Sequence, residues 1–166
     1  MERTFALYQE FDEAVDCYAS QPEYFNVFGA RYTPDFLIHY KSGYAEYAEV
    51  KHSSFMRDDF SAKHERRKQV IHAINKHDLQ LVSELDFNSV QTANYELLYP
   101  YKQLDISTIR SEIDYLPKRI PFAKLECAVK KLVGANSAHA WALVANQFFL
   151  FDTSQPLRPE TKLMRA

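Results

Sequence analysis

Residues 34–51 carry the sequence PDFLIHYKSGYAEYAEVK, and this stretch decides the fold. Residues 35–40 form a run of β-forming residues that is too short for a helix. Residues 44–51 resume as a second such run, with polar and apolar residues mixed. The Lys-Ser-Gly sequence at 41–43 is typical of a compact turn. We therefore expect these residues to form a β-hairpin.

The length of the turn sets which residues of the hairpin lie opposite each other. A three-residue loop at 41–43 would pair Tyr40 with Tyr44. The same register would place Asp35 opposite Glu49. Two carboxylates would then meet at the open end of the hairpin.

A two-residue loop would give a different outcome, and the sequence leaves both registers open. It would place Asp35 across from Val50, facing the other way unless a β-bulge corrected it. In either register Glu49 and Lys51 share one face of their strand, because side chains alternate along a strand. The three-residue loop thus predicts a cluster of two carboxylates and one amine.

The segments around the hairpin indicate a mixed α/β sheet flanked by helices. Apolar residues spaced by three and four predict a helix over residues 2–19. A second helix is expected over residues 60–76, and a strand over residues 79–85. A strand, a helix and a strand in that order favour a right-handed crossover with parallel pairing. If residues 24–28 also form a strand, the order is αβββαβ.

The pattern changes after Pro100 and the polar residues that follow it, which predicts a domain boundary there. We expect a core domain at residues 1–103 and a small helical domain at residues 104–166. The second domain would contain three short helices and a strand, at residues 106–116, 122–132, 138–145 and 148–151. Such a count is typical of a helix-turn-helix or winged-helix appendage.

Composition excludes several classes of protein. The chain has 166 residues, of which 46% are hydrophobic and 25% charged, and its 12 Phe, 11 Tyr and 1 Trp argue against disorder. Its two cysteines, Cys17 and Cys127, are far apart and lack the spacing of a zinc site or a disulfide framework. No apolar run approaches the roughly 20 residues of a membrane span, and the start is acidic. We therefore expect a cytoplasmic location and no membrane association.

Charge is distributed unevenly along the chain, although the net charge is only −2. Residues 1–60 contain 5 Lys and Arg against 11 Asp and Glu, a balance of −6, whereas residues 61–166 contain 15 against 11, a balance of +4. An acidic front and a basic back suit a metal-dependent enzyme that acts on a polyanion, although ordinary surfaces show such asymmetry as well.

The cluster at the end of the hairpin predicts a specific chemistry. Converging carboxylates repel each other, and a hard divalent cation, Mg²⁺ by default with Mn²⁺ as a substitute, relieves the repulsion. Such a cation can activate water and offset the charge that builds on a phosphodiester. Lys51 could orient the water or stabilise the developing oxyanion. The cationic run at residues 63–68 follows the hairpin and could contact flanking phosphates.

Several stretches resemble a known family. Residues 31–37 (RYTPDFL) and 49–51 (EVK) are similar to the core motifs of the PD-(D/E)xK nuclease superfamily, and within it of the TnsA-type transposon endonucleases. The opening stretch 2–22 resembles that family's first helix and turn. Looser similarity continues at residues 81–84, 94–99 and 143–161.

The resemblance implies a fold, a cofactor and site residues. The fold would be a restriction-endonuclease-like mixed sheet. Glu2, Asp35 and Glu49 would be metal ligands together with the carbonyl of Val50, and Lys51 would be the catalytic lysine. The cofactor would be Mg²⁺, with Mn²⁺ able to replace it.

The resemblance also implies an activity and partners. The protein would be a DNA endonuclease that cuts one strand at each transposon end. Its partners would be DNA, a DDE-type transposase that cuts and joins the other strand, and an ATP-dependent transposition regulator. Two alternatives remain: a stand-alone restriction or junction-type nuclease, and a non-catalytic adaptor of the same fold.

Overall fold

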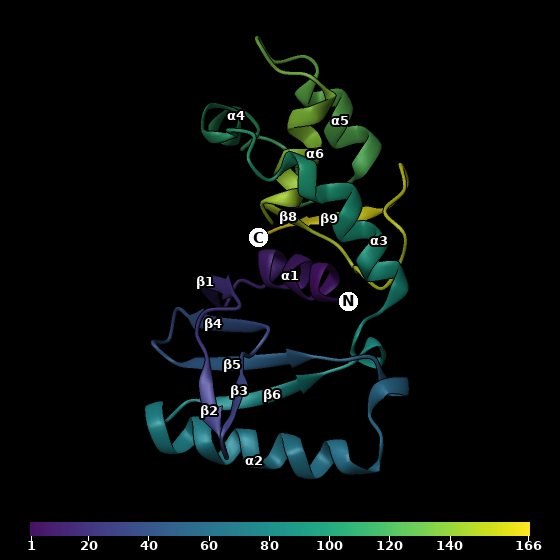
Figure 1. Cartoon of the computed structure of the whole chain (residues 1–166). Helices are drawn as coiled ribbons and strands as arrows, with labels where there is room; N and C mark the ends of the chain where they lie inside the picture. The colour runs from purple at the N-terminus through teal and green to yellow at the C-terminus, as the bar shows by residue number, and fades with distance from the viewer. The chain divides into compact units, whose positions relative to one another are not determined.

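The structure is a computed structural model that describes residues 1–166, apart from the side chain of Asp58. The chain forms two compact units, Met1–Phe87 and Asn88–Ala166 (Figure 1). The predicted boundary after residue 103 therefore lies later in the chain than the division between the units. Residues 88–103 contain helix α3 and a short 3₁₀ helix, which contact α6 of the second unit.

A four-stranded mixed sheet, in the order β1-β4-β5-β6, forms the centre of the first unit. Its strands are β1 (Val15–Ser20), β4 (Phe36–Tyr40), β5 (Ala45–Val50) and β6 (Asp78–Val82). β4 pairs antiparallel with both β1 and β5, whereas β5 and β6 are parallel and are joined through helix α2 (Asp58–Asn75). The structure confirms the predicted hairpin, the helical crossover and the mixed sheet.

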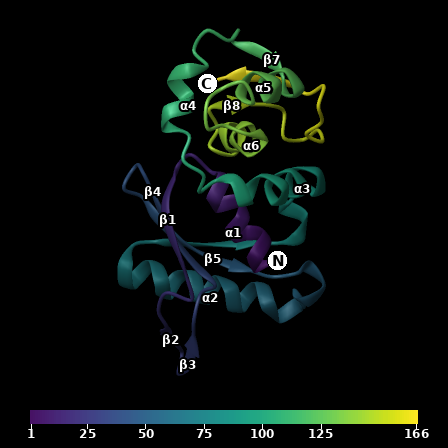
Figure 2. The same ribbon diagram turned by 90° about the horizontal axis from the view of Figure 1, so that it is seen from above.

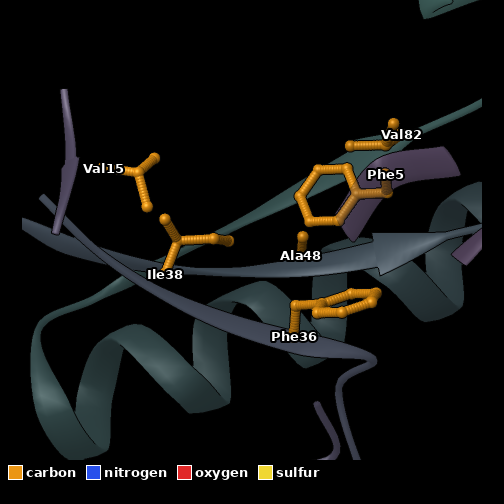
Figure 3. Packing of buried hydrophobic residues seen from close by; sticks show 6 residues of the cluster. All are labelled: Phe5, Val15, Phe36, Ile38, Ala48 and Val82. Carbon is orange, nitrogen blue, oxygen red and sulfur yellow. The ribbon is translucent and has the colours of Figure 1, made fainter. Parts of the chain in front are cut away.

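The two faces of this sheet are covered by different helices (Figure 1). Helix α1 (Glu2–Phe11) covers one face, where the rings of Phe5 and Phe36 lie 4.9 Å apart between centroids. Figure 3 shows the cluster that they join, formed by Phe5, Val15, Phe36, Ile38, Ala48 and Val82. On the other face Ile71 of α2 packs with Tyr47 and Leu79. Alternate residues of β5 therefore face α1 and α2.

The first predicted helix is too long. A helix was expected over residues 2–19, but α1 ends at Phe11 and the chain turns into β1. Asp12 begins this turn, since its Oδ1 accepts a 2.8 Å hydrogen bond from the backbone N–H of Ala14. Pairing of β1 with β4 then outweighs the helical spacing of the apolar residues.

A separate hairpin, β2 (Phe25–Val27) and β3 (Ala30–Tyr32), packs against the α2 side of the sheet. The ring of Phe25 meets that of Tyr47 edge-on, with centroids 5.4 Å apart. In Figure 2 the hairpin projects away from the body of the first unit. β2 confirms the strand considered at residues 24–28, whereas β3 was not predicted.

The second unit combines four helices with a three-stranded antiparallel sheet in the order β7-β9-β8. The helices are α3 (Ser89–Leu98), α4 (Ser107–Glu112), α5 (Phe122–Val129) and α6 (Ser137–Ala145). The strands are β7 (Arg119–Pro121), β8 (Phe149–Leu150) and β9 (Lys162–Arg165). The three helices and the strand expected after residue 103 are present, while β7 and β9 were not predicted.

A buried asparagine of α3 forms hydrogen bonds with the loop between β8 and β9. The Nδ2 atom of Asn94 donates to the carbonyls of Thr153 and Gln155, at 2.9 and 2.8 Å, and its Oδ1 accepts from the N–H of Leu157 at 2.9 Å. One side chain therefore satisfies three backbone groups of a loop far away in sequence.

Cys17 on β1 and Cys127 on α5 are both exposed and unpaired. None of the helices that the structure describes has the length and apolar character needed to cross a bilayer.

Candidate active site

The candidate site lies at the open end of the β4–β5 hairpin, and its position follows from the turn. Tyr40 N–H donates to the carbonyl of Tyr44 at 2.9 Å, which closes a three-residue loop. Phe36 accordingly pairs with Ala48. This confirms the register that brings Asp35 to the end of β5 where Glu49 lies.

Asp35 is anchored to β5 by both its backbone and its side chain. Its N–H donates to the carbonyl of Ala48 at 3.0 Å, and its Oδ2 accepts a 2.7 Å hydrogen bond from the N–H of Val50. Its Oδ1 has no hydrogen-bond partner among the residues that the structure describes. Oδ2 of Asp35 is therefore bound to the backbone of β5, while Oδ1 can bind a ligand.

The surroundings of Asp35 oppose its negative charge. Burial raises the pKa of this carboxyl above its ordinary value, the hydrogen bond from Val50 lowers it, and the charges of Glu49 and Glu2 raise it again. The positive charge of Lys51 lowers it. Burial is the largest of these effects, so the net upward direction mainly reflects the loss of solvation of the Asp35 carboxylate.

Glu49 is buried, and both of its carboxylate oxygens have partners. Oε1 lies 3.0 Å from the Nη1 of Arg67 on α2, and Oε2 accepts a hydrogen bond from the hydroxyl of Tyr32 on β3. The guanidinium of Arg67 also lies 4.1 Å from the centroid of the Tyr32 ring. Burial, followed by the bond to Glu49, raises the pKa of the Tyr32 hydroxyl well above its ordinary value, so Tyr32 stays a proton donor.

Lys51 follows β5 and faces the same side of the sheet as Glu49. Its N–H donates to the carbonyl of Val82 at 2.8 Å, which holds it at the end of β5 beside β6. Its Nζ lies 4.8 Å from the centroid of the Phe60 ring on α2. Because Glu49 and Lys51 both contact α2, the predicted sharing of one face is confirmed.

Glu2 approaches the site from a different element. It is the first residue of α1 and is exposed to solvent. Its charge acts on Asp35, so the end of α1 lies within electrostatic range of the hairpin end. Glu2 therefore adds to the negative potential at Asp35 from the α1 side, while Glu49 acts from the α2 side.

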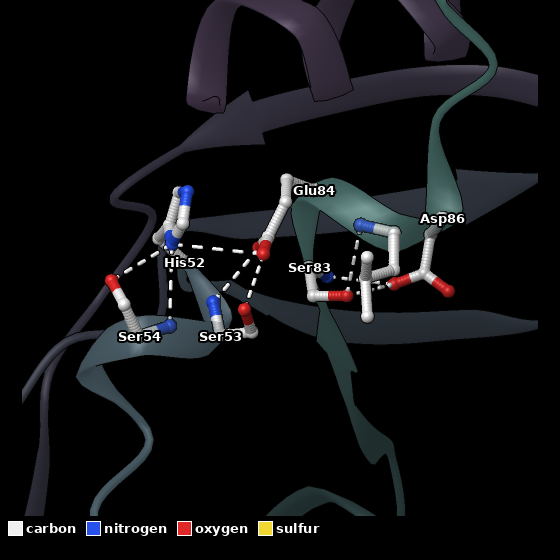
Figure 4. A network of polar contacts seen from close by, with 7 residues as sticks. His52, Ser53, Ser54, Ser83, Glu84 and Asp86 are labelled. Atoms are coloured by element: carbon white, nitrogen blue, oxygen red, sulfur yellow. Dashed lines mark hydrogen bonds and ion pairs between the residues drawn. The ribbon is translucent and has the colours of Figure 1, made fainter.

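A polar network fixes the segment that follows Lys51 (Figure 4). The Oε2 of Glu84 accepts a 2.8 Å hydrogen bond from the N–H of Ser53, and its Oε1 accepts one from the Ser53 hydroxyl. The Nδ1 of His52 lies 3.6 Å from Oε1 of Glu84. The bonds from Ser53 lower the pKa of Glu84. Through these contacts the 3₁₀ helices Ser53–Phe55 and Glu84–Asp86 are held together beside the site.

Three of these residues were not identified from the sequence: Tyr32, Arg67 and Glu84. Arg67 was noted only as one member of a cationic helix face. Its neighbours on that face differ in role, because Lys63 pairs with Asp59 one turn away on the same helix. Nothing in the sequence distinguishes Arg67 from Arg66 or Lys68.

The arrangement is rich in oxygen donors, but it is not a preassembled metal site. Among the residues that the structure describes, no three His, Cys, Asp or Glu side chains lie close enough together to hold one ion. Each carboxylate oxygen of Glu49 already has one partner and retains a further lone pair that could bind a cation. Asp35 alone has a carboxylate oxygen that is already free and directed by a backbone anchor.

Comparison with known proteins adds no relative, since no family model matches the chain and no curated protein matches it. The similarity to TnsA-type endonucleases therefore rests on the residues quoted from the sequence.

Proposed function

We propose that this protein is a metal-dependent DNA endonuclease that hydrolyses phosphodiester bonds, and that it cuts one strand at transposon ends as a TnsA-like subunit. The observation that supports the proposal is that Asp35 and Glu49 lie at the open end of one hairpin beside Lys51, where the charges of Glu49, Glu2 and Lys51 all act on the Asp35 carboxyl. A carboxyl whose pKa is raised, next to a cationic side chain in such a cluster, is typical of catalytic sites. The adjacent cationic helix suits a polyanionic substrate.

The order of elements supports a restriction-endonuclease-like fold for the first unit. Helix α1 and strand β1 precede the β2–β3 hairpin, the antiparallel β4–β5 hairpin, helix α2 and the parallel strand β6, and Asp35, Glu49 and Lys51 lie at one end of the β4–β5 hairpin. For the second unit we propose a winged-helix-like appendage, because helices α4, α5 and α6 alternate with the antiparallel strands in the order α4-β7-α5-α6-β8-β9.

The appendage does not offer its third helix for base readout. In helix-turn-helix proteins the recognition helix presents polar side chains to the major groove. α6, with the sequence SAHAWALVA, contains no Lys or Arg, and Ala140, Ala142, Leu143, Val144 and Ala145 are buried. We therefore assign α6 a packing role.

A hard divalent cation fits the site in charge and in the type of donor. Asp35 would bind it through its free Oδ1, with Glu49, the carbonyl of Val50 and Glu2 completing the protein's oxygen ligands. The free Oδ1 of Asp35 and the nearby negative charges of Glu49 and Glu2 are the features that fit. When bound, Mg²⁺ or Mn²⁺ supplies an activated water and offsets the charge on the phosphate.

The side chains of the protein perform the remaining tasks. Val50 N–H fixes the carboxylate plane of Asp35, and Tyr32 and Arg67 hold Glu49 in one position. Lys51, backed by the Phe60 ring, brings a positive charge to the place where negative charge develops during hydrolysis. The Ser53–Glu84 contacts keep the backbone after Lys51 from shifting.

Nicking of supercoiled plasmid in Mg²⁺ or Mn²⁺ tests the proposal. We expect Asp35→Ala and Lys51→Met to lower the nicking rate by about 100-fold or more, the usual effect of losing a charge-stabilising group. Lys41→Met is the matched control, since Lys41 lies in the turn at the opposite end of the same hairpin. It should nick at the wild-type rate.

Because a transposition subunit can be silent alone, the assay is repeated with a transposase and its regulator. Binding of Mn²⁺ by the wild type and its loss in Asp35→Ala, measured by calorimetry, is a second readout that needs no partner. Equal nicking by wild type and Asp35→Ala, with no Mn²⁺ bound by either, would refute the enzyme. Cutting of transposon ends separates the TnsA-like role from a stand-alone restriction or junction nuclease.

A non-catalytic adaptor of the same fold is the second candidate, and one observation favours it. Both oxygens of Glu49 are bound by Arg67 and Tyr32, as in a structural ion pair. The adaptor predicts that Glu49→Gln lowers stability without affecting any function of the protein. The endonuclease predicts that the same substitution abolishes metal-dependent nicking.

A further inference from the structure

The turn of the β2–β3 hairpin contains an aromatic residue at a position whose backbone conformation favours glycine or asparagine. Phe28 and Gly29 form the two-residue turn between Val27 and Ala30, which pair across the hairpin. Phe28 has φ +51° and Gly29 has φ +85°. Turns of this kind favour Asn-Gly or Gly-Gly, and a bulky residue at positive φ is an outlier.

Phe28 gains no burial in return for this backbone strain. Its side chain is 80% exposed, among the highest values for an aromatic residue here. The backbone strain at Phe28 is therefore not offset by burial of its side chain, and strain of this sort concentrates at functional positions. The observation points to a role outside the fold of the hairpin itself.

Cationic groups surround the tip. The guanidinium of Arg66 on α2 lies 6.0 Å from the centroid of the Phe28 ring. The guanidinium of Arg31 lies 4.3 Å from the centroid of Tyr24, which is itself 61% exposed. No ion pair engages Arg31 or Arg66 in the part of the chain that the structure describes. We call Tyr24, Phe28, Arg31 and Arg66 the tip surface.

Among the described residues, Glu23 and Glu65 form no ion pair with Arg31 or Arg66, and both carboxylates accept hydrogen bonds from other side chains. Glu23 accepts a hydrogen bond from the hydroxyl of Tyr47, so its carboxylate is directed toward the sheet. Glu65 accepts one from the Nε2 of Gln69 along α2. The tip surface therefore presents aromatic rings and free guanidinium groups together.

The tip surface and the candidate site are joined by two continuous elements. Tyr32, at the far end of β3 from the turn, contacts Glu49, and Arg67, next to Arg66 on α2, pairs with the same carboxylate. At about 3.3 Å per residue, β3 extends about 7 Å from Tyr32 to Ala30, roughly two base steps of B-DNA, and the turn with Phe28 and Gly29 follows directly. One strand of nucleic acid can reach both places.

We propose that the tip surface binds DNA next to the scissile position, with Phe28 stacking on an unpaired base and Arg66 and Arg31 contacting phosphates. Exposed aromatic rings stack on bases of any sequence, and guanidinium groups add electrostatic affinity. The inference rests on DNA as the substrate of the proposed function. Because intact duplex offers no free base face, single-stranded DNA or a frayed end is the preferred ligand.

Binding is measured by fluorescence anisotropy in EDTA, so that cleavage plays no part. The probes are a labelled 20-mer single strand and the duplex of the same sequence, with the full-length protein. Phe28→Asn removes the ring and places a residue suited to positive φ in the turn. We expect Phe28→Asn to raise the Tm by several degrees and to weaken binding of the single strand by about 10-fold.

Two further variants sharpen the test. Arg66→Gln is expected to weaken binding of both probes. It should also reduce the slope of the logarithm of the binding constant against the logarithm of the salt concentration by about one released counterion. Tyr115→Ala is the control, since Tyr115 is 70% exposed but lies in the second unit. It should bind the single strand as tightly as the wild type.

The outcomes distinguish this inference from the proposed function. The inference is overturned if Phe28→Asn binds the single strand as tightly as the wild type does. It is also overturned if the wild type binds neither probe while Phe28→Asn is more stable. Either result would assign the tip surface to a protein partner. Phe28-dependent binding without any nicking activity supports it while the endonuclease proposal fails. Normal nicking with Phe28-independent binding refutes this inference alone.

Discussion

The carboxylate of Asp35 accepts a 2.7 Å hydrogen bond from the backbone N–H of Val50, across the open end of the β4–β5 hairpin. This bond stabilises the charged form of Asp35, while burial and two nearby carboxylates oppose it. The net effect raises the pKa of Asp35, so the folded protein holds a proton on this carboxyl more tightly than the unfolded chain does. The stability of the protein should therefore depend on pH in a defined direction.

Asp35→Asn is expected to stabilise the protein at neutral pH. A carboxyl pKa above 3.8 means that the folded state binds more protons between 3.8 and the raised value, so the free energy of unfolding falls as pH rises through that window. The neutral amide avoids this loss. The gain should be below about 1 kcal/mol, because solvent partly screens the half-buried group.

Urea denaturation of both proteins from pH 4 to pH 8 provides the check. The advantage of Asp35→Asn should shrink as the pH falls toward 3.8. Asp16→Asn, at an exposed position of β1, serves as the control. A variant that is less stable than the wild type at pH 7 would contradict the raised pKa.

Arg67→Met should destabilise the protein by about 1–3 kcal/mol, because it leaves the buried carboxylate of Glu49 without its ionic partner. Adding Glu49→Gln should restore part of the loss, which a double-mutant cycle in urea would detect. Arg66→Met is the matched control on the same helix and should change stability by less than about 0.5 kcal/mol. Equal effects of the two arginine variants would exclude a specific Glu49–Arg67 pair.

Gly43→Ala should lower stability by about 1 kcal/mol, since Gly43 has φ +84° in the turn that sets the hairpin register. Apart from Gly43 and its two chain neighbours, no atom of the described residues lies within 4 Å of the position that a Cβ would occupy, so the effect is conformational and not a clash. Thermal unfolding compared with Ser42→Ala in the same turn measures it. No loss in Gly43→Ala would mean that the turn adopts another conformation.

Asn94→Ala should destabilise the second unit by about 2–4 kcal/mol, because two carbonyls and one N–H of the loop at residues 153–157 lose their partner. Hydrogen exchange should locate the change, with the amide of Leu157 losing protection first. Asn146→Ala, which removes a single bond to the carbonyl of Ala142, is the comparison and should cost less. Similar losses in both variants would show that the loop does not depend on Asn94.

The β4–β5 hairpin could be predicted from the sequence because its determinants are local. The three-residue turn and the alternation of side chains fix which residues oppose each other. The sequence left a two-residue and a three-residue loop open, and the three-residue loop found in the structure is the one that brings Asp35 to Glu49. The alternation of side chains placed Lys51 on the face of Glu49 in either case. The helical crossover from β5 to β6 followed from the order of elements.

The end of the first helix was harder to predict, because Val15 and Tyr18 continue the helical spacing set by Phe5 and Phe11. The choice between helix and strand there depends on pairing with β4, a partner far along the chain. Similarly, Glu49 meets Tyr32 and Arg67 across 17 and 18 residues. Local patterns contain no information about contacts of this kind.

The two exposed thiols described above have a practical consequence. Cys17 belongs to the first compact unit and Cys127 to the second, and each lies on a regular element. The native chain thus already contains one maleimide-reactive position per unit. Spin labels or a donor–acceptor dye pair attached there would follow interdomain distance during DNA addition without any engineered substitution.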